Sequence, residues 1–382
     1  MDYLLSIVVP TKDRYFYLKH LIQLVKSFKS DEIELIIQDN TYDNTEILDY
    51  IENLNYCHLK YFYTKEQISV SDNSTKAILN STGEYVCFIG DDDGVTRHIV
   101  ECVKWMKDNH YDILKSELAL YRWPSFNETP SLASSLLLAD YSAKFKIIDN
   151  RVELKKCVDC CFDNLKNMPK VYNGIVKRTL LDDIYKKTST YFPGPSPDMA
   201  NAVALAVLNP SYVYVDFPII LGGRSGISGG NPNQYNNHGC AKIEEVPFLP
   251  KDSVANWEKR LPKLWCVETV WPESGIKALR SLKATDYLDQ IDYERVLSRF
   301  IVQRRWFWKE AFSLSQNKVK LSYLVVCGFL NKKINAKRIE IKKAKGIVED
   351  NLKVYHGVQN IIEAEKMIAD KYNSFVLTNK TL

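Results

Sequence analysis

The sequence predicts an α/β fold with a mostly parallel sheet, followed by an α-helical C-terminal region. Short apolar runs alternate with helix-patterned segments over residues 4–110, and this alternation is typical of βαβ units. Polar loops follow three of these runs, where parallel sheets bind their ligands. After residue 240 the apolar residues fall at helical spacing instead. We therefore expect one domain over residues 1–240 and a helical region over residues 241–382.

The expected strands are short, apolar and bounded by turn-forming residues. They are Leu4–Pro10, Glu34–Gln38, Leu59–Tyr63 and Tyr85–Ile89. Segments with apolar residues at helical spacing separate them, namely Tyr17–Phe28, Ile47–Ile51 and Ser71–Leu79. The loops Thr11–Arg14, Asp39–Thr45 and Asp91–Asp93 should then meet at one edge of the sheet.

The last of these loops places three acids directly after a buried strand. Asp91, Asp92 and Asp93 lie between Gly90 and Gly94, and adjacent carboxylates repel one another unless cations lie among them. If extended geometry continues past the strand, Asp91 and Asp93 point to the same side. Two carboxylates on one side suit a hard cation such as Mg²⁺ or Mn²⁺. The alternative is an acidic surface turn without a ligand.

The totals exclude several classes of protein. The net charge is +4, from 51 basic and 47 acidic residues, which argues against a dedicated nucleic-acid binder. The nine cysteines are irregularly spaced, as in a reduced cytosolic chain rather than a disulfide framework. No signal peptide is evident at the N-terminus, and no apolar run approaches the length of ~18–20 residues of a membrane span. We expect a cytoplasmic protein.

The middle of the chain contains a helix start and a glycine-rich segment. Ser196 is a candidate N-cap with Pro197 at the first helical position and Asp198 in the first turn, which is also ordinary helix-start chemistry. The expected strand Val213–Ile220 runs into Leu221–Pro232, which holds five glycines and predicts an irregular loop. That loop is either a lid over a ligand or a domain linker.

Three segments resemble the family 2 glycosyltransferases of the GT-A fold. Ser6–Arg14 is similar to the opening strand of that family, and Glu34–Thr45 is similar to its second strand and acidic loop. Ser81–Asp93 resembles the family's Gly-Glu-Tyr, strand and DxD segment. The resemblance is strong over residues 4–110 and weaker to about residue 230. The chain departs from it at Gln38, where an acid is common, and at Ser71–Asn73, where Ala-Arg-Asn is frequent.

The resemblance implies a nucleoside-diphosphate sugar donor, with a UDP-sugar expected and Asp39 accepting the imide N–H of uracil. The implied donor-binding residues are Pro10, Thr11, Asp13, Arg14, Asp39, Asn73, Asp91, Asp92 and Arg224. Mn²⁺ or Mg²⁺ would assist departure of the diphosphate, bound by Asp91, Asp93 and, as a further candidate, His238. Asp198 would be the general base that deprotonates the acceptor, which implies inversion at the anomeric carbon.

The resemblance also implies an acceptor, namely the hydroxyl of a glycan or lipid-linked glycan in the synthesis of a surface polysaccharide such as O-antigen or capsule. The basic stretch Lys332–Lys345 beside the apolar stretch Leu321–Leu330 is either a solvated helix face or a peripheral contact with anionic lipid at the inner face of the cytoplasmic membrane. Oligomer formation stays open.

Other functions use similar topologies. A Rossmann dinucleotide site needs a glycine-rich turn after the first strand, and Pro10–Arg14 contains no glycine. A sugar nucleotidyltransferase would carry an early glycine-rich loop with arginine, which is missing. The alternative that is not an enzyme is a scaffold subunit of the same fold, which binds nucleotide or glycan without catalysis.

Overall fold

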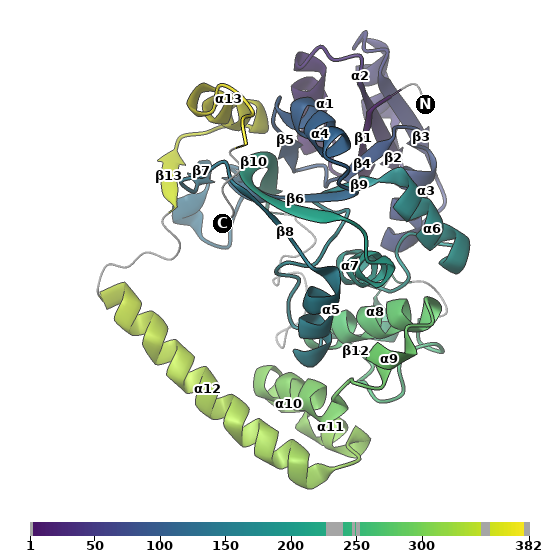
Figure 1. The fold of residues 1–382 in the computed structure, drawn as a ribbon, viewed down its shortest axis with the longest axis vertical. Helices are drawn as coiled ribbons and strands as arrows, with labels where there is room; N and C mark the ends of the chain where they lie inside the picture. Colours follow the sequence, from purple (N-terminus) through teal and green to yellow (C-terminus); the bar gives the residue numbers. More distant parts are fainter. Residues whose placement is uncertain (1–2, 227–239, 247–248, 250–252, 345–351, 378–382) are drawn as a thin grey trace.

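The computed structural model describes residues 3–226, 240–246, 249, 253–344 and 352–377. The expected α/β fold is confirmed: one large sheet is flanked by helices (Figure 1). The main path of the sheet runs in the order β13 (Lys353–His356), β7 (Ser135–Leu138), β6 (Ile113–Arg122), β9 (Ile175–Lys177), β4 (Tyr85–Phe88), β1 (Leu5–Thr11), β2 (Ile33–Asp39), β3 (Leu59–Tyr63). Off this path, β10 (Tyr212–Arg224) pairs with β5 (Gly94–Val95), β6 and β8 (Phe145–Ile147).

The three longest strand pairings are parallel, namely β10–β6, β1–β2 and β2–β3. In the register of β1 and β2, Thr11 lies beside Asp39. Every residue of β2 is buried, as expected of a parallel strand covered on both faces. The polar loops after β1, β2 and β4 therefore share one edge of the sheet, as the alternating pattern predicts.

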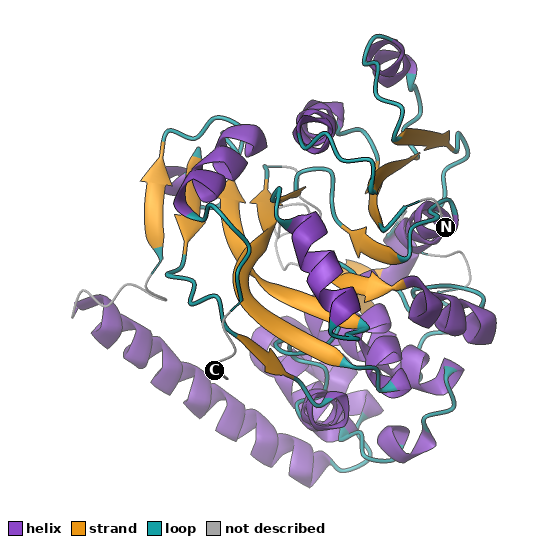
Figure 2. Ribbon diagram, turned by 45° about the horizontal axis from the view of Figure 1, so that its top comes forward, coloured by secondary structure: helices purple, strands orange, loops and turns teal. Residues whose placement is uncertain are grey.

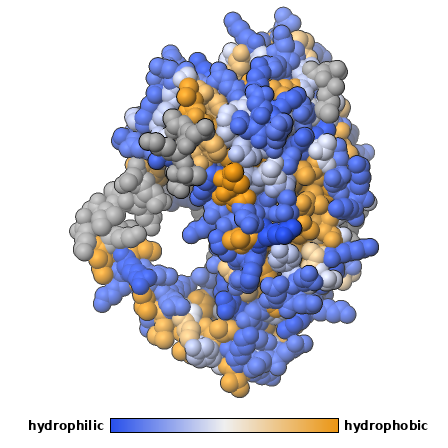
Figure 3. All heavy atoms as spheres, in the orientation of Figure 1, coloured by the Kyte–Doolittle hydropathy of each residue, from blue (hydrophilic) through white to orange (hydrophobic). Residues whose placement is uncertain are grey.

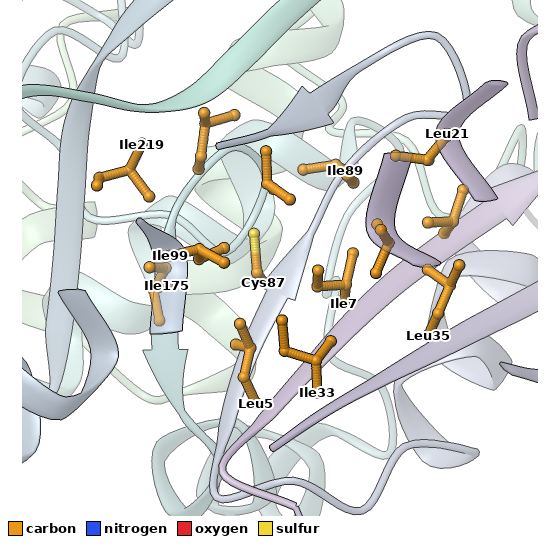
Figure 4. Packing of buried hydrophobic residues seen from close by; sticks show 14 of the residues in the cluster. Leu5, Ile7, Leu21, Ile33, Leu35, Cys87, Ile89, Ile99, Ile175 and Ile219 are labelled. Atoms are coloured by element: carbon orange, nitrogen blue, oxygen red, sulfur yellow. The ribbon is translucent and has the colours of Figure 1, made fainter. Parts of the chain in front are cut away.

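Helices cover both faces of the sheet (Figures 1 and 2). Those of the first half are α1 (Tyr15–Ser27), α2 (Thr45–Glu52), α3 (Val70–Leu79), α4 (Ile99–Asp108), α5 (Asn150–Asp159), α6 (Arg178–Thr188) and α7 (Pro197–Leu208). Figure 4 shows the core beside α1 and α4, where Leu21 and Ile99 pack against sheet residues such as Ile7 and Cys87. This core holds the strands that carry the polar loops.

Gly83, which precedes β4, has a structural role at the edge of the sheet opposite the polar loops. The buried Glu34 accepts hydrogen bonds from Ser6 Oγ at 2.6 Å and from Gly83 N at 3.0 Å. Its other oxygen lies 2.7 Å from Lys60 Nζ. A Cβ at Gly83 would lie 2.7 Å from the backbone nitrogen of Ser6. Only glycine allows this close approach, which fixes β4 beside β1.

The first part of the segment expected to be an irregular loop is a strand. β10 continues through Leu221 to Arg224, so the first part of the expected glycine-rich loop is sheet. Gly222 and Gly223 lie opposite Leu120 and Tyr121 of β6. Residues 227–232 of the glycine-rich segment lie outside the described residues.

The C-terminal region is helical as expected, with α8 (Val267–Ser281), α9 (Thr285–Leu288), α10 (Tyr293–Gln303), α11 (Trp308–Leu314) and α12 (Lys318–Ala344). A two-stranded sheet of β11 (Ala241–Lys242) and β12 (Leu264–Trp265) accompanies them. Along the described part of the chain, no helix has the length and apolar content that a membrane span requires.

The end of the chain returns to the main sheet. β13 pairs antiparallel with β7, and α13 (Ile361–Lys371) packs near α1. The Glu365 carboxylate holds α13 to the loop before α4, because Arg97 Nη2 lies 2.8 Å from Oε2 while Arg97 N and Nε donate to Oε1 at 3.0 Å. The expected division at residue 240 places β13 and α13 in the C-terminal region, although both elements contact the main sheet or its helices.

Candidate active site

The three acids after β4 lie in a tight turn and are almost completely covered. The strand ends at Phe88, and Asp93 N donates to Gly90 O at 3.2 Å. The exposed fractions of Asp91, Asp92 and Asp93 are 3%, 4% and 2%. Because extended geometry stops before the acids, strand alternation does not decide where their side chains point. Each carboxylate instead has its own set of contacts.

Arg14 lies between two of these carboxylates. Its Nε is 3.1 Å from Asp91 Oδ1, and its Nη2 is 2.6 Å from Asp92 Oδ2. Thr11 Oγ1 donates to Asp91 Oδ2 at 2.7 Å, and Ser225 Oγ donates to Asp92 Oδ2 at 2.8 Å. One internal cation therefore offsets much of the repulsion between the two acids.

Asp93 is held by the backbone and by a tyrosine. Its Oδ1 accepts from Gly223 N at 2.8 Å, and its Oδ2 accepts from Gly90 N at 2.9 Å and from the Tyr172 hydroxyl at 3.1 Å. A Cβ at Gly223 would lie 1.6 Å from the carbonyl oxygen of Asp92. β10 can therefore approach the acidic turn only because residue 223 is glycine.

Burial dominates the protonation of this cluster. It raises the pKa of Asp91 and that of Asp93 to about 7, and the charge of Asp92 adds to both shifts. Arg14 opposes the shift of Asp91, while the donors Gly90 and Gly223 oppose that of Asp93. Near neutral pH, protons therefore compete with any cation for these oxygens.

Asp39 lies at the end of β2 and is fully buried. Its Oδ2 accepts from the Tyr15 hydroxyl at 2.6 Å and the Tyr61 hydroxyl at 2.7 Å, and its Oδ1 accepts from Thr41 N at 2.8 Å. Burial, together with the hydrogen bond to Asp39, raises the pKa of both tyrosines. Oδ1 keeps the capacity to accept one further donor.

The other expected donor-binding residues of this edge surround the loops. Pro10 lies in β1 opposite Gln38. The exposed Asp13 has φ 58° and donates its N–H to Thr41 Oγ1 at 2.8 Å. Asn73 Nδ2 donates to Thr11 O at 3.5 Å and to Gln38 O at 3.4 Å. Its buried Oδ1 has no hydrogen-bond partner among the described residues, so it is available to a ligand hydroxyl.

One expected site residue, Arg224, pairs with another acid instead of the acidic turn. Arg224 Nη2 lies 2.8 Å from Glu128 Oε1, while its neighbours Gly223 and Ser225 contact the acidic turn. This difference follows from the alternation of side chains along a strand. His238 lies outside the described residues.

Asp198 stands in the first turn of α7, where it was expected. Pro197 occupies the start of the helix, but the Ser196 side chain makes no cap hydrogen bond. Burial raises the pKa of Asp198, and the charge of Lys170 opposes this shift. Burial and the charges of Asp93 and Asp198 raise the pKa of Tyr172. The charges of both acids therefore act on the Tyr172 hydroxyl.

The carboxylates fit a divalent cation only together with a ligand. Among the described residues, no group of three or more His, Cys, Asp or Glu side chains is arranged to hold a metal. Asp91 Oδ1 is buried and accepts no hydrogen bond from a described residue, although Arg14 Nε is near. Mg²⁺ commonly takes one or two carboxylates and completes its shell with phosphate oxygens and water. Asp91 and Asp93 suit that arrangement.

Sequence reasoning did not identify Tyr172, Trp123 or Gly223 as site residues. Trp123 is fully buried, and its Nε1 donates to the carbonyl oxygen of Asp92 at 2.8 Å. Tyr172 precedes β9, and Gly223 lies near the end of β10, so both come from segments far from the acids in sequence. No local pattern marks them, because their role comes from strand order.

Comparison with known proteins finds a match to one protein family. Residues 6–171 match the model of glycosyl transferase family 2. This segment is a family 2 glycosyltransferase domain. The glycosyltransferase domain contains Thr11, Arg14, Asp39 and the acidic turn, while Tyr172 and Asp198 follow the matched residues. No curated protein matches the chain significantly.

Solved structures with a similar arrangement include TarS from S. aureus and a mannosyltransferase from Pyrobaculum calidifontis. TarS 1-349 in complex with UDP-GlcNAc is 16% identical with a TM-score of 0.45, and the match covers 93% of this chain and 97% of that one. The mannosyltransferase PcManGT in complex with GDP-Man and Mn²⁺ is 13% identical with a TM-score of 0.40, and the match covers 87% of each chain.

A longer TarS structure is 17% identical to this chain with a TM-score of 0.43. The match covers 82% of this chain but 46% of the TarS chain, so this chain spans about half of that protein.

Proposed function

We propose that the chain transfers a sugar, with inversion, from a nucleoside-diphosphate sugar to a hydroxyl of a glycan or lipid-linked glycan. A UDP-sugar is the first donor to test. The observation that carries the proposal is the shared edge of the sheet, where Thr11, Arg14 and Asp39 surround the acidic turn. Parallel sheets bind ligands at this edge, and the family match covers all of these residues.

The donor would lie across the ends of β1, β2 and β4. Asp39 Oδ1 would accept the imide N–H of the base, and Thr11 and the unpaired Asn73 Oδ1 would contact the nucleoside. Asp39 has no exposed area, so neighbouring side chains must move for a base to reach it. Pro10 and Asp13 would line the same space, and Arg224 would contact phosphate only after leaving Glu128.

Arg14 is the cation best placed for the diphosphate. Its guanidinium already spans the gap between Asp91 and Asp92, and guanidinium groups match phosphate oxygens in pairs. The arginine that the family often carries near Asn73 is missing here. We infer that Arg14 exchanges Asp91 for phosphate oxygens when the donor binds, while it keeps its contact with Asp92.

Asp91 and Asp93 would hold Mn²⁺ or Mg²⁺ together with the diphosphate. The ion, when bound, supplies Lewis-acid stabilisation of the leaving diphosphate. Asp92 then faces Arg14 and Ser225, and it keeps Arg14 oriented toward the phosphates. Tyr172 donates to Asp93 Oδ2 and so leaves Oδ1, which Gly223 N contacts, with a lone pair for the cation.

Asp198 would act as the general base. It removes the proton of the acceptor hydroxyl while that oxygen forms a bond to the anomeric carbon. The bond from this carbon to the diphosphate breaks on the opposite face, and its electron pair stays with the phosphate oxygen. Burial raises the pKa of Asp198, which makes it a stronger base, and Lys170 keeps it ionised.

A donor-turnover assay tests the proposal. The full chain should release nucleoside diphosphate from a nucleotide sugar in the presence of Mn²⁺, and faster when a glycan acceptor is present. Asp198→Asn should retain donor binding in a thermal-shift assay and lose at least about 100-fold in turnover. Full turnover by Asp198→Asn, or by enzyme stripped with a chelator, would contradict the assigned roles.

A non-catalytic subunit that binds nucleotide or glycan as a scaffold remains a second candidate. The observation that favours it is the closed acidic turn, in which Arg14 already occupies the space between two acids. Such a subunit would bind nucleotide sugars without turnover. A chain that shifts its melting temperature with UDP-sugar and Mn²⁺ but releases no UDP under any condition would identify it.

The cellular setting follows from the acceptor. A surface polysaccharide built on a lipid-linked glycan is assembled at the inner face of the cytoplasmic membrane, and we propose this location for the chain. The transferase unit would consist of residues 1–240 completed by the C-terminal return of β13 and α13, with the helices from α8 to α12 as the region for acceptor, oligomer or membrane contacts.

A further inference from the structure

The helix α12 has one packed face. Its N-terminal half rests on α10, where Leu321 is buried beside Leu297 and Phe300. A Cβ at Gly328 would lie 2.7 Å from Val302 Cγ2, so the two helices are in close contact there. Beyond Lys332, whose Nζ donates to Gln303 Oε1 at 2.9 Å, every residue of α12 up to Ile341 is exposed.

The opposite face of α12 carries a line of exposed apolar side chains, which we name the α12 stripe. Its members and their exposed fractions are Val319 (82%), Tyr323 (68%), Val326 (58%), Leu330 (55%), Ile334 (50%) and Ile341 (46%). At about 100° per residue, all six fall within an arc of about 80° and extend over about 33 Å of the helix. Leu321 and Gly328 lie on the other side of the helix by the same geometry.

Cations surround the α12 stripe. From Lys318 to Ile341 the helix has a single acid, Glu340, and its basic residues are Lys318, Lys320, Lys332, Lys333, Lys337 and Arg338. By helical spacing, Lys337 lies within the arc of the stripe, and Lys333 and Arg338 border it on its two sides. None of these three forms an ion pair with a described residue, whereas Lys320 pairs with Asp292 at 2.9 Å.

The views agree on where this helix lies. Figures 1 and 2 show α12 along the outside of the molecule. In Figure 3, orange and blue spheres alternate along the lower left edge, where α12 runs in Figure 1. Phe329 and Ile339 are exposed outside the arc of the stripe, but the stripe itself combines apolar side chains with bordering lysine and arginine, as helices that lie in the surface of a membrane do.

We propose that the α12 stripe docks the protein on an anionic lipid surface, with the helix axis in the plane of the membrane. The apolar side chains would enter the boundary between headgroups and acyl chains, while Lys333, Lys337 and Arg338 would meet lipid phosphates. The proposed function gives this contact a purpose, a lipid-linked acceptor, but the docking itself rests on α12 alone.

A second copy of the chain fits the stripe less well. Two α12 stripes packed in parallel would bring Lys337 of each copy against like charge. In an antiparallel pair Lys337 would enter the apolar contact without a counter-charge. A neutral apolar partner would leave these cations without a counter-charge. An anionic bilayer satisfies both the apolar face and the cations at once.

The test is co-sedimentation of the full chain with vesicles, without donor or acceptor. Vesicles that contain phosphatidylglycerol should retain the protein, and pure phosphatidylcholine vesicles should retain at least about tenfold less. Leu330→Glu with Ile334→Glu should weaken binding at least about tenfold, as should Lys333→Glu with Lys337→Glu. Lys155→Glu with Lys186→Glu, an equal charge change on α5 and α6, should bind like the unaltered chain.

Several outcomes would overturn the proposal. One is an unaltered chain that ignores anionic vesicles. Another is equal loss of binding in the Lys155 and Lys186 control, which would indicate a general charge effect. A third is a dimer in light scattering that Leu330→Glu with Ile334→Glu converts to monomer, which would assign the stripe to a second copy. Circular dichroism verifies that each variant is folded.

The proposed catalytic function fails separately from the docking. Asp198→Asn should bind anionic vesicles like the unaltered chain even where turnover is lost. Conversely, a chain without turnover that still binds vesicles through the α12 stripe would leave the docking proposal intact.

Discussion

At the scale of single residues, the site depends on how closely β10 approaches the acidic turn. Gly223 N donates to Asp93, and Trp123 Nε1 and Ser225 Oγ hold Asp92 from nearby positions. The approach of β10 to the turn is possible only because residue 223 lacks a Cβ. The buried turn with three carboxylates is therefore held by its neighbours as well as by its own hydrogen bonds between Gly90 and Asp93.

We expect Gly223→Ala to displace the acidic turn and to destabilise the fold by about 3 kcal/mol. The added Cβ would meet backbone atoms of Asp92, which cannot rotate away. Gly222→Ala is the matched control, because the nearest atoms to its Cβ are side-chain carbons at 3.6 Å. Urea unfolding and donor binding measure both variants. Equal stability of the two would contradict the close approach of β10.

Lys170 should tune the acid limb of the pH–rate profile through Asp198. A general base works when deprotonated, so turnover falls as the pH drops through its pKa. Burial raises the pKa of Asp198 and Lys170 lowers it, so Lys170→Met should move the acid limb of kcat to higher pH. Lys187→Met on the exposed side of α6 should leave the limb in place. An unshifted limb in Lys170→Met would dissociate Asp198 from the chemistry.

Protons should compete with a divalent cation at the acidic turn. Burial raises the pKa of both Asp91 and Asp93 to about 7, so both are partly protonated at neutral pH and release protons when a cation binds. Mn²⁺ affinity in the presence of UDP should therefore rise from pH 6 to pH 8. Titration calorimetry in buffers of different ionisation enthalpy would count the protons released. Affinity that does not change with pH would contradict this competition.

At the scale of elements, α13 supports the segment that follows the acidic turn. A Cβ at Gly94 would lie 2.8 Å from Ile361 of α13, and Glu365 binds Arg97 through both of its oxygens. The helix at the end of the chain thus fixes β5 and the start of α4.

We expect Glu365→Gln to weaken this support. Arg97 keeps a partly exposed guanidinium, so the loss is modest, about 1 kcal/mol, and the melting temperature should fall by about 2 °C. Asp370→Asn removes the same charge from an exposed position of α13 and should change the melting temperature less. Equal effects of the two variants would show that α13 responds to its net charge rather than to the ion pair with Arg97.

The strands beside the acids could be predicted because their pattern is local. Mostly apolar runs mark β1, β2 and β4, and each ends at a polar loop. Gly222 and Gly223 were expected in a loop, because composition does not reveal that β6 and the acidic turn need small residues there. β13 has only four residues, Lys353–His356, which is too short for a periodic signal. Its place is decided by β7, more than 200 residues away in sequence.

The same reasoning explains which residues of the site could be predicted from the sequence and which could not. Thr11, Arg14, Asp39 and the acids sit at strand ends, so parallel order alone brings them together. Tyr172 reaches Asp93 only because β9 inserts between β4 and β6, and nothing near residue 172 indicates that order. Arg224 and Ser225 are neighbours in sequence but face opposite partners, a choice that depends on the phase of β10.

At the scale of the whole molecule, the contacts between elements group the chain into parts that do not follow a single boundary in the sequence. The first half of the sheet and the return of β13 and α13 form one body, and the helices from α8 to α12 follow the glycine-rich segment before that return (Figure 1). The proposed transferase site and the α12 stripe belong to different parts of this arrangement.

Removal of residues 352–382 should therefore damage the sheet rather than only shorten the chain. β7 would lose its partner β13, and the Leu24 and Tyr121 side chains would lose the cover of α13. We expect the shortened chain to aggregate at concentrations at which the full chain is monodisperse in light scattering, because an unpaired strand edge recruits other chains. A monodisperse, active shortened chain would contradict this expectation.

The position of β13 also sets an order of events during synthesis. A ribosome releases β7 more than 200 residues before its edge partner, and at about 5–20 residues per second the edge stays open for ten seconds or more. Until β13 is synthesised, Leu136 to Leu138 stay unpaired on one side of the nascent sheet. Late closure by a charged four-residue strand, Lys353–His356, then makes the finished edge short and poorly suited to recruit another chain. Synthesis through β13 is therefore needed for the solubility of the chain as well as for completion of its fold.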